Sequence, residues 1–318
     1  MGRKNMINII GKRYWFFLIS AIVIIPGIIS LIVYGLKPSN DFQSGTTMTL
    51  TFNPTVEESA LRQSMTAAGY QDATIQHSSS GDFYISIREI TPDERVTLQN
   101  DLQTSLKSTL TVDNYATTSA AVASQTVRYA IIAVIVAAIF IMIYISAVFH
   151  RMPRPTRWGI CAIIALLHDI LVVIGIFSIL GWVLGVKIDA LFITGMLTVA
   201  GYSVHDTIVV FDRIRENIIK GNNKDFEQVA NFSVNETFVR SLNTSLTVLF
   251  VLFALFLIGG STIHYFVLVL LIGVITGTYS SICNASALLV VWENNEWRRF
   301  VSWIPGVPKG KKPEAKAA

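Results

Sequence analysis

Charged residues are scarce in this chain of 318 residues. Asp, Glu, Lys and Arg make up 14% of it, whereas soluble domains average roughly a quarter. The chain also has only two cysteines, Cys161 and Cys283, and both lie in apolar runs, so no exposed disulfide framework is expected. Hydrophobic residues account for 52% and the mean hydropathy is +0.53. This composition excludes an ordinary soluble domain and predicts a membrane protein.

Short motifs of hydrolytic chemistry are also missing. The sequence has no G-x-x-x-x-G-K-[ST] phosphate loop, no H-E-x-x-H and no G-x-S-x-G. We therefore expect no enzyme activity, no cofactor and no metal. The net charge of +4 is small, and we attribute it to membrane topology and contact with anionic lipid headgroups, so we predict no nucleic-acid partner.

Six apolar windows are long enough to cross a bilayer, which takes about 20 residues for roughly 30 Å of hydrocarbon. They cover residues 14–36, 129–149, 158–180, 188–210, 241–258 and 266–292. The first window is too long for a signal-peptide core and no Ala-x-Ala site follows it, so we expect it to remain as an anchor. In the last window, Gly273 and Gly277 have the small-xxx-small spacing that allows close helix packing.

The distribution of Lys and Arg predicts the topology, because basic residues resist translocation. They gather in the segments that become internal if the N-terminus is cytoplasmic. The predicted division is a cytoplasmic N-terminus (1–13), a first transmembrane helix (14–36), an extracytoplasmic α+β domain (37–127), transmembrane helices 2 to 6 (128–292) with an inner loop (213–238), and a basic cytoplasmic tail (293–318).

The segment between the first two spans predicts a small α+β domain. Alternating apolar residues indicate strands at 45–53, 73–77, 82–88 and 110–115, with a turn at 78–81. Two capping-box spacings, Thr55 with Glu58 and Thr91 with Glu94, predict helices that start near residues 56 and 92. The order β-α-β-β-α-β is that of a ferredoxin-like fold. The predicted architecture is thus a six-helix transmembrane bundle with an extracytoplasmic ferredoxin-like domain.

An acidic residue stands out in the fourth span. Asp206 lies in an otherwise apolar run, where a charged carboxylate costs roughly 2.5 to 3.5 kcal/mol on insertion scales. It lies about 10 Å deeper than Arg213 at 1.5 Å per residue. The predicted partner is Arg240, which opens the next, antiparallel span. Two interpretations stay open: a static ion pair that fixes helix register, and a proton relay in which protonation of Asp206 releases Arg240.

Other polar residues near the middle of the spans form a possible accessory network. His205 adjoins Asp206 but points about 100° away around the helix. His168 and Asp169 form a second His-Asp pair in the third span. The remaining members, from the same polar run as Asp206, are Ser203 and Thr207.

Four stretches of the sequence together resemble the SecF branch of the SecD/SecF family of protein-export subunits. The longest is GYSVHDTIVVFDRIREN at 201–217. The others are DFQSG at 41–45, the His-Asp pair of the third span, and NETFVRSLNTS at 235–245. The chain departs from the family pattern at His205, where Asn is usual, and at Ser44, where Gly is usual.

The resemblance implies membership of the resistance-nodulation-division superfamily and a place in the bacterial cytoplasmic membrane. It implies partnership with SecD, the SecYEG channel and often YajC, acting after the SecA motor. The proton-motive force would then pull the translocating preprotein outward, with Asp206 and Arg240 in the positions used for proton conduction. Two alternatives stay open: a half-transporter of the same superfamily that moves lipid or small molecules, and a passive subunit that stabilises SecD.

Overall fold

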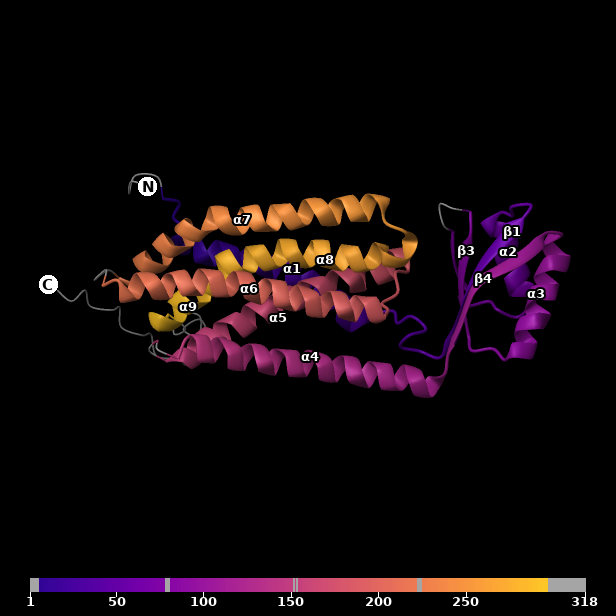
Figure 1. The fold of residues 1–318 in the computed structure, drawn as a ribbon, viewed down its shortest axis with the longest axis horizontal. Helices are drawn as coiled ribbons and strands as arrows, with labels where there is room; N and C mark the ends of the chain where they lie inside the picture. Colours follow the sequence, from indigo (N-terminus) through magenta and orange to yellow (C-terminus); the bar gives the residue numbers. More distant parts are fainter. Residues whose placement is uncertain (1–5, 78–80, 151, 153, 222–224, 297–318) are drawn as a thin grey trace.

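A computed structural model describes most of the chain, namely residues 6–77, 81–150, 152, 154–221 and 225–296. Most of the predicted turn at 78–81 and of the predicted basic tail at 293–318 lies outside the described residues. The molecule is elongated, with a helical bundle at one end and a small α+β domain at the other (Figure 1).

Among the described residues, six helical segments are long and apolar enough to cross a membrane, as the sequence predicted. The last one contains a π-helical stretch that the sequence analysis did not predict. The segments are α1 (Arg13–Tyr34), preceded by the short 3₁₀ helix η2 (Ile10–Lys12), then α4 (Ala120–Val148), α5 (Pro155–Leu184), α6 (Ala190–Ile219), α7 (Phe226–Ile258), and α8 (Ser261–Tyr279) continuing through the π-helix η3 (Ser280–Ala285) into α9 (Ser286–Glu293).

Helices α6 and α7 extend through most of the predicted inner loop 213–238, which is a difference from the sequence analysis. Polar contacts between the two helices explain the extension. The guanidinium of Arg213 donates to both carboxylate oxygens of Glu236, at 2.8 and 2.7 Å, and Asn217 Nδ2 donates to Ser233 Oγ at 2.9 Å. The two helices therefore continue as a pair beyond the apolar part of the bundle.

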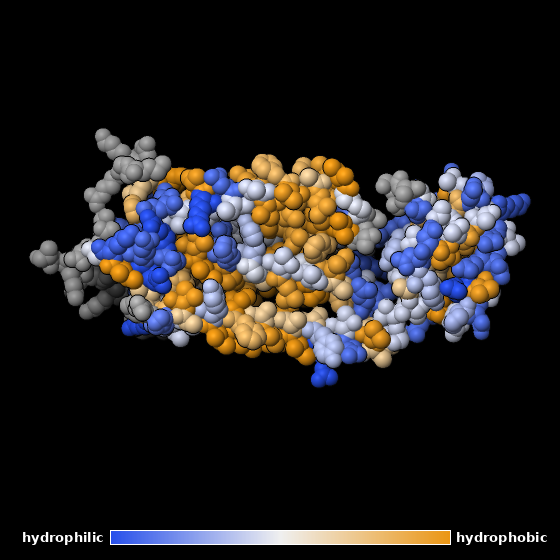
Figure 2. Space-filling view, in the orientation of Figure 1, coloured by the Kyte–Doolittle hydropathy of each residue, from blue (hydrophilic) through white to orange (hydrophobic). Residues whose placement is uncertain are grey.

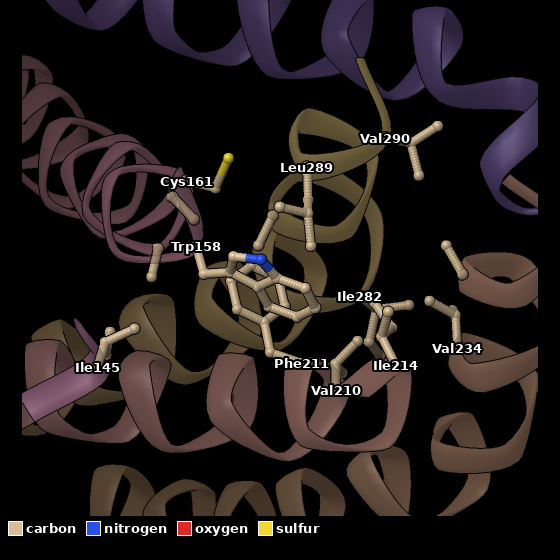
Figure 3. Packing of buried hydrophobic residues seen from close by; sticks show 14 of the residues in the cluster. Ile145, Trp158, Cys161, Val210, Phe211, Ile214, Val234, Ile282, Leu289 and Val290 are labelled. Atoms are coloured by element: carbon tan, nitrogen blue, oxygen red, sulfur yellow. The ribbon is translucent and has the colours of Figure 1, made fainter. Parts of the chain in front are cut away.

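Aromatic rings fill the bundle core at the end away from the α+β domain. Trp158 of α5 stacks on Phe149, with ring centroids 5.2 Å apart, and meets Phe211 of α6 edge-on at 5.4 Å. Figure 3 shows Trp158 and Phe211 close to Leu289 of α9, with Cys161 nearby. Cys161 is fully buried and forms no disulfide bond with Cys283.

Helices α6 and α8 approach closely where α8 carries glycines. A Cβ atom added to Gly273 would overlap the side chain of Val199, and one added to Gly277 would lie 3.1 Å from Ser203 Cβ. The predicted small-xxx-small spacing thus marks a close contact between α8 and the side chains of α6. It brings η3, which follows Gly277, against the middle of α6.

The α+β domain has the predicted strand and helix order. Its elements are β1 (Gly45–Asn53), α2 (Glu58–Ala67), β2 (Thr74–His77), β3 (Phe83–Ile87), α3 (Pro92–Leu106) and β4 (Thr109–Thr118). The strands form an antiparallel sheet in the order β2-β3-β1-β4. This is the ferredoxin-like arrangement. Leu61 of α2 and Leu98 of α3 pack on the sheet residues Leu50 and Ile85 in one buried cluster.

One of the two predicted capping boxes forms and the other does not. Thr91 accepts from the N–H of Glu94, whose carboxylate accepts from the N–H of Thr91. Helix α2 instead begins at Glu58. The preceding N-cap residue, Glu57, makes no side-chain hydrogen bond to the start of the helix. The segment before α2 is held near the start of β4, because Ser108 Oγ donates to the carbonyl of Pro54 at 2.7 Å. This explains why α2 starts later than predicted.

Replacing Thr91 by Ala should lower the local stability of α3 by about 1 kcal/mol, because the N–H of Glu94 then loses its acceptor. Thr55→Ala is the matched control, since Thr55 caps no helix. Amide hydrogen exchange of the α3 residues in the full chain measures the difference. Equal exchange of α3 in the two variants would contradict the assignment.

The same cap should make α3 sensitive to acid. The backbone N–H of Thr91 donates to the Glu94 carboxylate at 2.8 Å and holds the pKa of Glu94 below its ordinary value. A carboxyl group with a lowered pKa contributes stability above its unfolded pKa and loses it as the pH falls through the folded pKa. The exchange protection of α3, corrected for intrinsic rates, should therefore fall in acid, and Glu94→Gln should reduce this pH dependence.

Candidate functional site

A carboxylate from α5 lies at the centre of the bundle. Asp169 has no exposed surface, and its Oδ2 atom accepts from Ser203 Oγ of α6 and, at 2.7 Å, from Ser280 Oγ of η3. Its Oδ1 atom lies 2.9 Å from Nδ1 of His168. Hydrogen bonds from three partners compensate the carboxylate for the loss of water. Asp169 thereby joins three helical segments at one point.

The network continues from His168 to the first helix. His168 Nε2 lies 2.9 Å from Ser20 Oγ of α1, and Ser20 Oγ also accepts from Asn284 Nδ2 of η3 at 2.8 Å. The Oδ1 atom of Asn284 is buried, and no described residue hydrogen-bonds to it. A connected path of polar side chains thus runs from α1 through α5 to α6 and the last helix.

The π-helix η3 presents the side chains that close this network. Ser281 Oγ lies 2.8 Å from Thr207 Oγ1 and donates to the carbonyl of Ser203 at 3.1 Å. A π-helical turn holds an extra residue, and such turns are often found at functional sites. Here η3 places Ser280, Ser281 and Asn284 on buried positions around Asp169.

Asp206 lies in a second, smaller polar contact between α6 and α7. Its side chain is buried, with 5% of its surface exposed, and Oδ1 accepts from Ser241 Oγ at 3.0 Å. The Oδ2 atom is buried and has no hydrogen-bond partner in the described part of the chain. One turn away, Tyr202 donates to Ser245 at 2.9 Å across the same two helices. Asp206 is therefore less well satisfied than Asp169.

The predicted contact between Asp206 and Arg240 is not an ion pair in the described part of the chain. Arg240 is exposed on α7, whereas its neighbour Ser241 faces α6 and makes the contact with Asp206. Successive residues of a helix point about 100° apart, so Arg240 is turned to the outside of the bundle. The sequence analysis placed the partner of Asp206 on the correct helix, α7. The residue that contacts Asp206 is Ser241, which follows the predicted Arg240.

The other predicted residues divide into two groups. Ser203, Thr207, His168 and Asp169 belong to the buried network, and this places the predicted accessory residues of α5 and α6 together. His205 is exposed on α6 and turned away from that network. The polar interior therefore centres on Asp169 and not on His205.

Polar residues also line an exposed face of the bundle, which we call the α6–α7 polar stripe. Figure 2 shows pale and blue residues crossing the apolar surface on the face that carries these helices. A polar face at membrane depth is costly against lipid and indicates contact with another protein or with water. The stripe consists of Thr194, Thr198, Gly201 and His205 of α6 and of Glu236, Arg240, Asn243, Thr244 and Thr247 of α7.

Sequence reasoning missed five residues that build these contacts: Ser20, Ser241, Ser280, Ser281 and Asn284. Small polar residues are common in membrane helices, so each alone carries a weak signal. The cluster of Ser280, Ser281 and Asn284 within one apolar span was a usable signal. No group of three or more possible metal ligands occurs in the described residues. The chemistry available is hydrogen bonding and proton transfer by two buried carboxylates.

Comparison with known proteins gives the class of this membrane bundle. The family described as "Protein export membrane protein SecD/SecF, C-terminal" matches residues 96–295. The family described as "SecD/SecF GG Motif" matches residues 29–56. A protein translocase subunit SecF from Thermobaculum terrenum is 45% identical over 308 residues, covering 93% of this chain and 96% of that protein. SecF from Anaerolinea thermophila is 40% identical, covering 93% and 97%.

The fold agrees with these relatives. A crystal structure of SecDF from Thermus thermophilus superposes with a TM-score of 0.80 at 31% identity, covering 92% of this chain and 40% of that one. The chain therefore belongs to the SecD/SecF family of protein-export membrane proteins. Its relatives of similar length are SecF subunits of protein translocase, which supports the SecF role in protein export.

Removing the central carboxylate should destabilise the bundle more than removing Asp206. Asp169→Ala leaves the hydroxyls of Ser203 and Ser280 and the ring of His168 without their acceptor, and each buried group left unsatisfied costs about 1–3 kcal/mol. Asp206→Ala is the matched control, because it removes one hydrogen bond. We expect a larger fall of the melting temperature in detergent for Asp169→Ala, and equal falls would contradict the central position of Asp169.

Proposed function

We propose that this chain uses the proton-motive force for protein export, with Asp206 as the group that takes up the proton and Arg240 as its electrostatic partner. The observation that carries the proposal is the buried Oδ2 atom of Asp206, which has no hydrogen-bond partner among the residues that the structure describes. A proton on that atom removes the charge that burial disfavours. Arg240 stands one residue from Ser241, which binds Asp206.

The membrane potential supplies enough energy for such a step. Moving one charge across the membrane is worth roughly 2.3 kcal/mol per 100 mV. A difference of about 1.4 kcal/mol already changes an equilibrium tenfold. Protonation of Asp206 can therefore shift the contact between α6 and α7. The proposed subunit is a transport component and performs no enzyme reaction.

We propose SecD as the partner that covers the α6–α7 polar stripe. This chain corresponds to 40% of the SecDF crystal chain and to 38% of the SecDF relative from Bacillus subtilis, which is 33% identical. The remainder of those chains would be supplied here by a separate SecD. A partner helix with an acidic residue would pair with Arg240, which is exposed and forms no ion pair among the described residues.

The distribution of basic residues supports an orientation for the complex. We propose that both termini are cytoplasmic and that the α+β domain lies outside the bacterial cytoplasmic membrane. There it would meet the preprotein that emerges from SecYEG after the SecA-driven stage, with YajC as a further possible subunit. Surrounding lipids would contact the apolar faces of α1, α4 and α7.

Asp206→Asn should lower the secretion that depends on the proton-motive force at least tenfold in inverted membrane vesicles. The amide keeps a hydrogen-bond acceptor for Ser241 but cannot take up a proton at this position. Asp212→Asn is the matched control on the same helix, since Asp212 pairs with Arg215 at 2.9 Å near the end of α6. Normal secretion by Asp206→Asn vesicles that contain the protein and SecD would refute the proposal.

Arg240→Ala should cause a similar loss, while the variant still inserts and co-purifies with SecD. The double variant Asp206→Leu with Arg240→Leu tests the passive alternative. A subunit that merely stabilises SecD should tolerate apolar residues at both positions, because neither charge would then have a role in secretion. Full secretion by the double variant would favour the passive function and would contradict the proton relay.

A further inference from the structure

The segment between α1 and the α+β domain contacts α6 directly. Residues 37–39 pair with the α5–α6 connection: Pro38 forms a parallel bridge with Ile188, Ser39 N donates to Ile188 O at 2.7 Å, and Ile188 N donates to Lys37 O at 2.8 Å. These backbone bonds hold the segment against the start of α6. They leave the next two side chains, Asn40 and Asp41, free to point to different elements.

Asn40 binds the sheet of the α+β domain. Its Oδ1 atom accepts from Ser86 Oγ of β3 at 3.0 Å, and its Nδ2 atom donates to the carbonyl of Ile87 at 3.4 Å. A Cβ atom on Gly45, the first residue of β1, would lie 2.5 Å from the Asn40 side chain. Gly45 is therefore required for Asn40 to lie flat against the first strand.

Asp41 binds the helix that carries Asp206. Its Oδ2 atom accepts from the backbone N–H of Ala190 at 2.9 Å, and Ala190 is the first residue of α6. Asp41 is not the N-cap of α6. The N-cap is Asp189, whose Oδ1 atom accepts from Phe192 N at 2.8 Å. A carboxylate at this helix end is also favoured by the helix dipole. Helix α6 thus has its own cap and a second acidic contact that comes from another segment.

We propose that Asn40 and Asp41 form a joint that couples the α+β domain to α6, with Asp41 as a positioning residue for the helix that bears Asp206. Adjacent residues hold β3 on one side and the α6 N-terminus on the other, so a displacement of α6 reaches the sheet through two residues. The inference rests on the proposed proton-driven function. It assigns a role to the segment between 37 and 45, within the range that matches the GG motif.

The hydrogen bond between Ala190 N and Asp41 Oδ2 can be removed by changing either residue. Asp41→Ala removes the acceptor. Ala190→Pro removes the donor, because proline has no N–H, and it suits the first position of a helix. Asp189 has extended backbone angles (φ −126°, ψ −176°), as a residue before proline requires. The two variants change different segments and share the loss of this contact.

The first measurement is secretion driven by the proton-motive force in vesicles that contain this chain and SecD. We expect Asp41→Ala and Ala190→Pro each to lower it at least fivefold, and the double variant to be no worse than either one. Asp41→Asn keeps an acceptor oxygen and should stay within twofold of the wild type. Asp189→Ala is the matched control, since it removes the helix cap and leaves the joint. If Asp189→Ala lowered secretion as much as Asp41→Ala does, the proposal would be overturned.

The second measurement does not depend on secretion. Spin labels at Gln103 of α3 and Thr194 of α6, both exposed, report the distance between the domain and the helix in a chain whose two cysteines are replaced by Ala. We expect a broader distance distribution in Asp41→Ala and Ala190→Pro, and an unchanged one in Asp189→Ala. If the distance distributions of Asp41→Ala and Ala190→Pro were no broader than that of the wild type, the proposed joint would be refuted. Normal secretion by Asp206→Asn would instead refute the proton relay and leave this result standing.

Discussion

The bundle depends on the burial of one carboxylate among several helices. The side chain of Asp169 is tolerable inside a membrane protein because hydroxyls from α6 and η3 and the ring of His168 surround it. Each of these donors must be held in place, and this requires the close approach of α6 to α8 at Gly273. The hydrophobic effect does not drive helices together in lipid, so close packing at small residues and these hydrogen bonds select the arrangement. The polar centre therefore specifies the bundle that the apolar residues fill.

Much of the fold was predictable from local patterns. Spans, strands and the cap at Thr91 follow from hydrophobic periodicity and from residues that act within one turn of chain. The cap expected at Thr55 failed because a distant residue, Ser108, holds the preceding segment. The π-helix and the end positions of α6 and α7 were missed for the same reason, since contacts between helices determine them.

The site was predictable in its location and not in its detail. Buried acids in two spans were visible from sequence because a charge in an apolar run is costly. The sequence does not show which of the two acids has all its hydrogen bonds satisfied, because the partners of Asp169 come from three segments: α5, α6 and η3. The outward direction of Arg240 depends on how α7 is rotated against α6, and composition does not encode that rotation.

The glycine contact between α6 and α8 also limits how the bundle can move. At Gly273 the side chain of Val199 occupies the space that a Cβ atom would need, so α6 and α8 fit closely together there. The boundary between α6 and α7 is different, because hydroxyls such as those of Ser241 and Ser245 can exchange acceptors with little cost. Relative movement of helices is therefore easier along that hydroxyl-lined boundary than between α6 and α8.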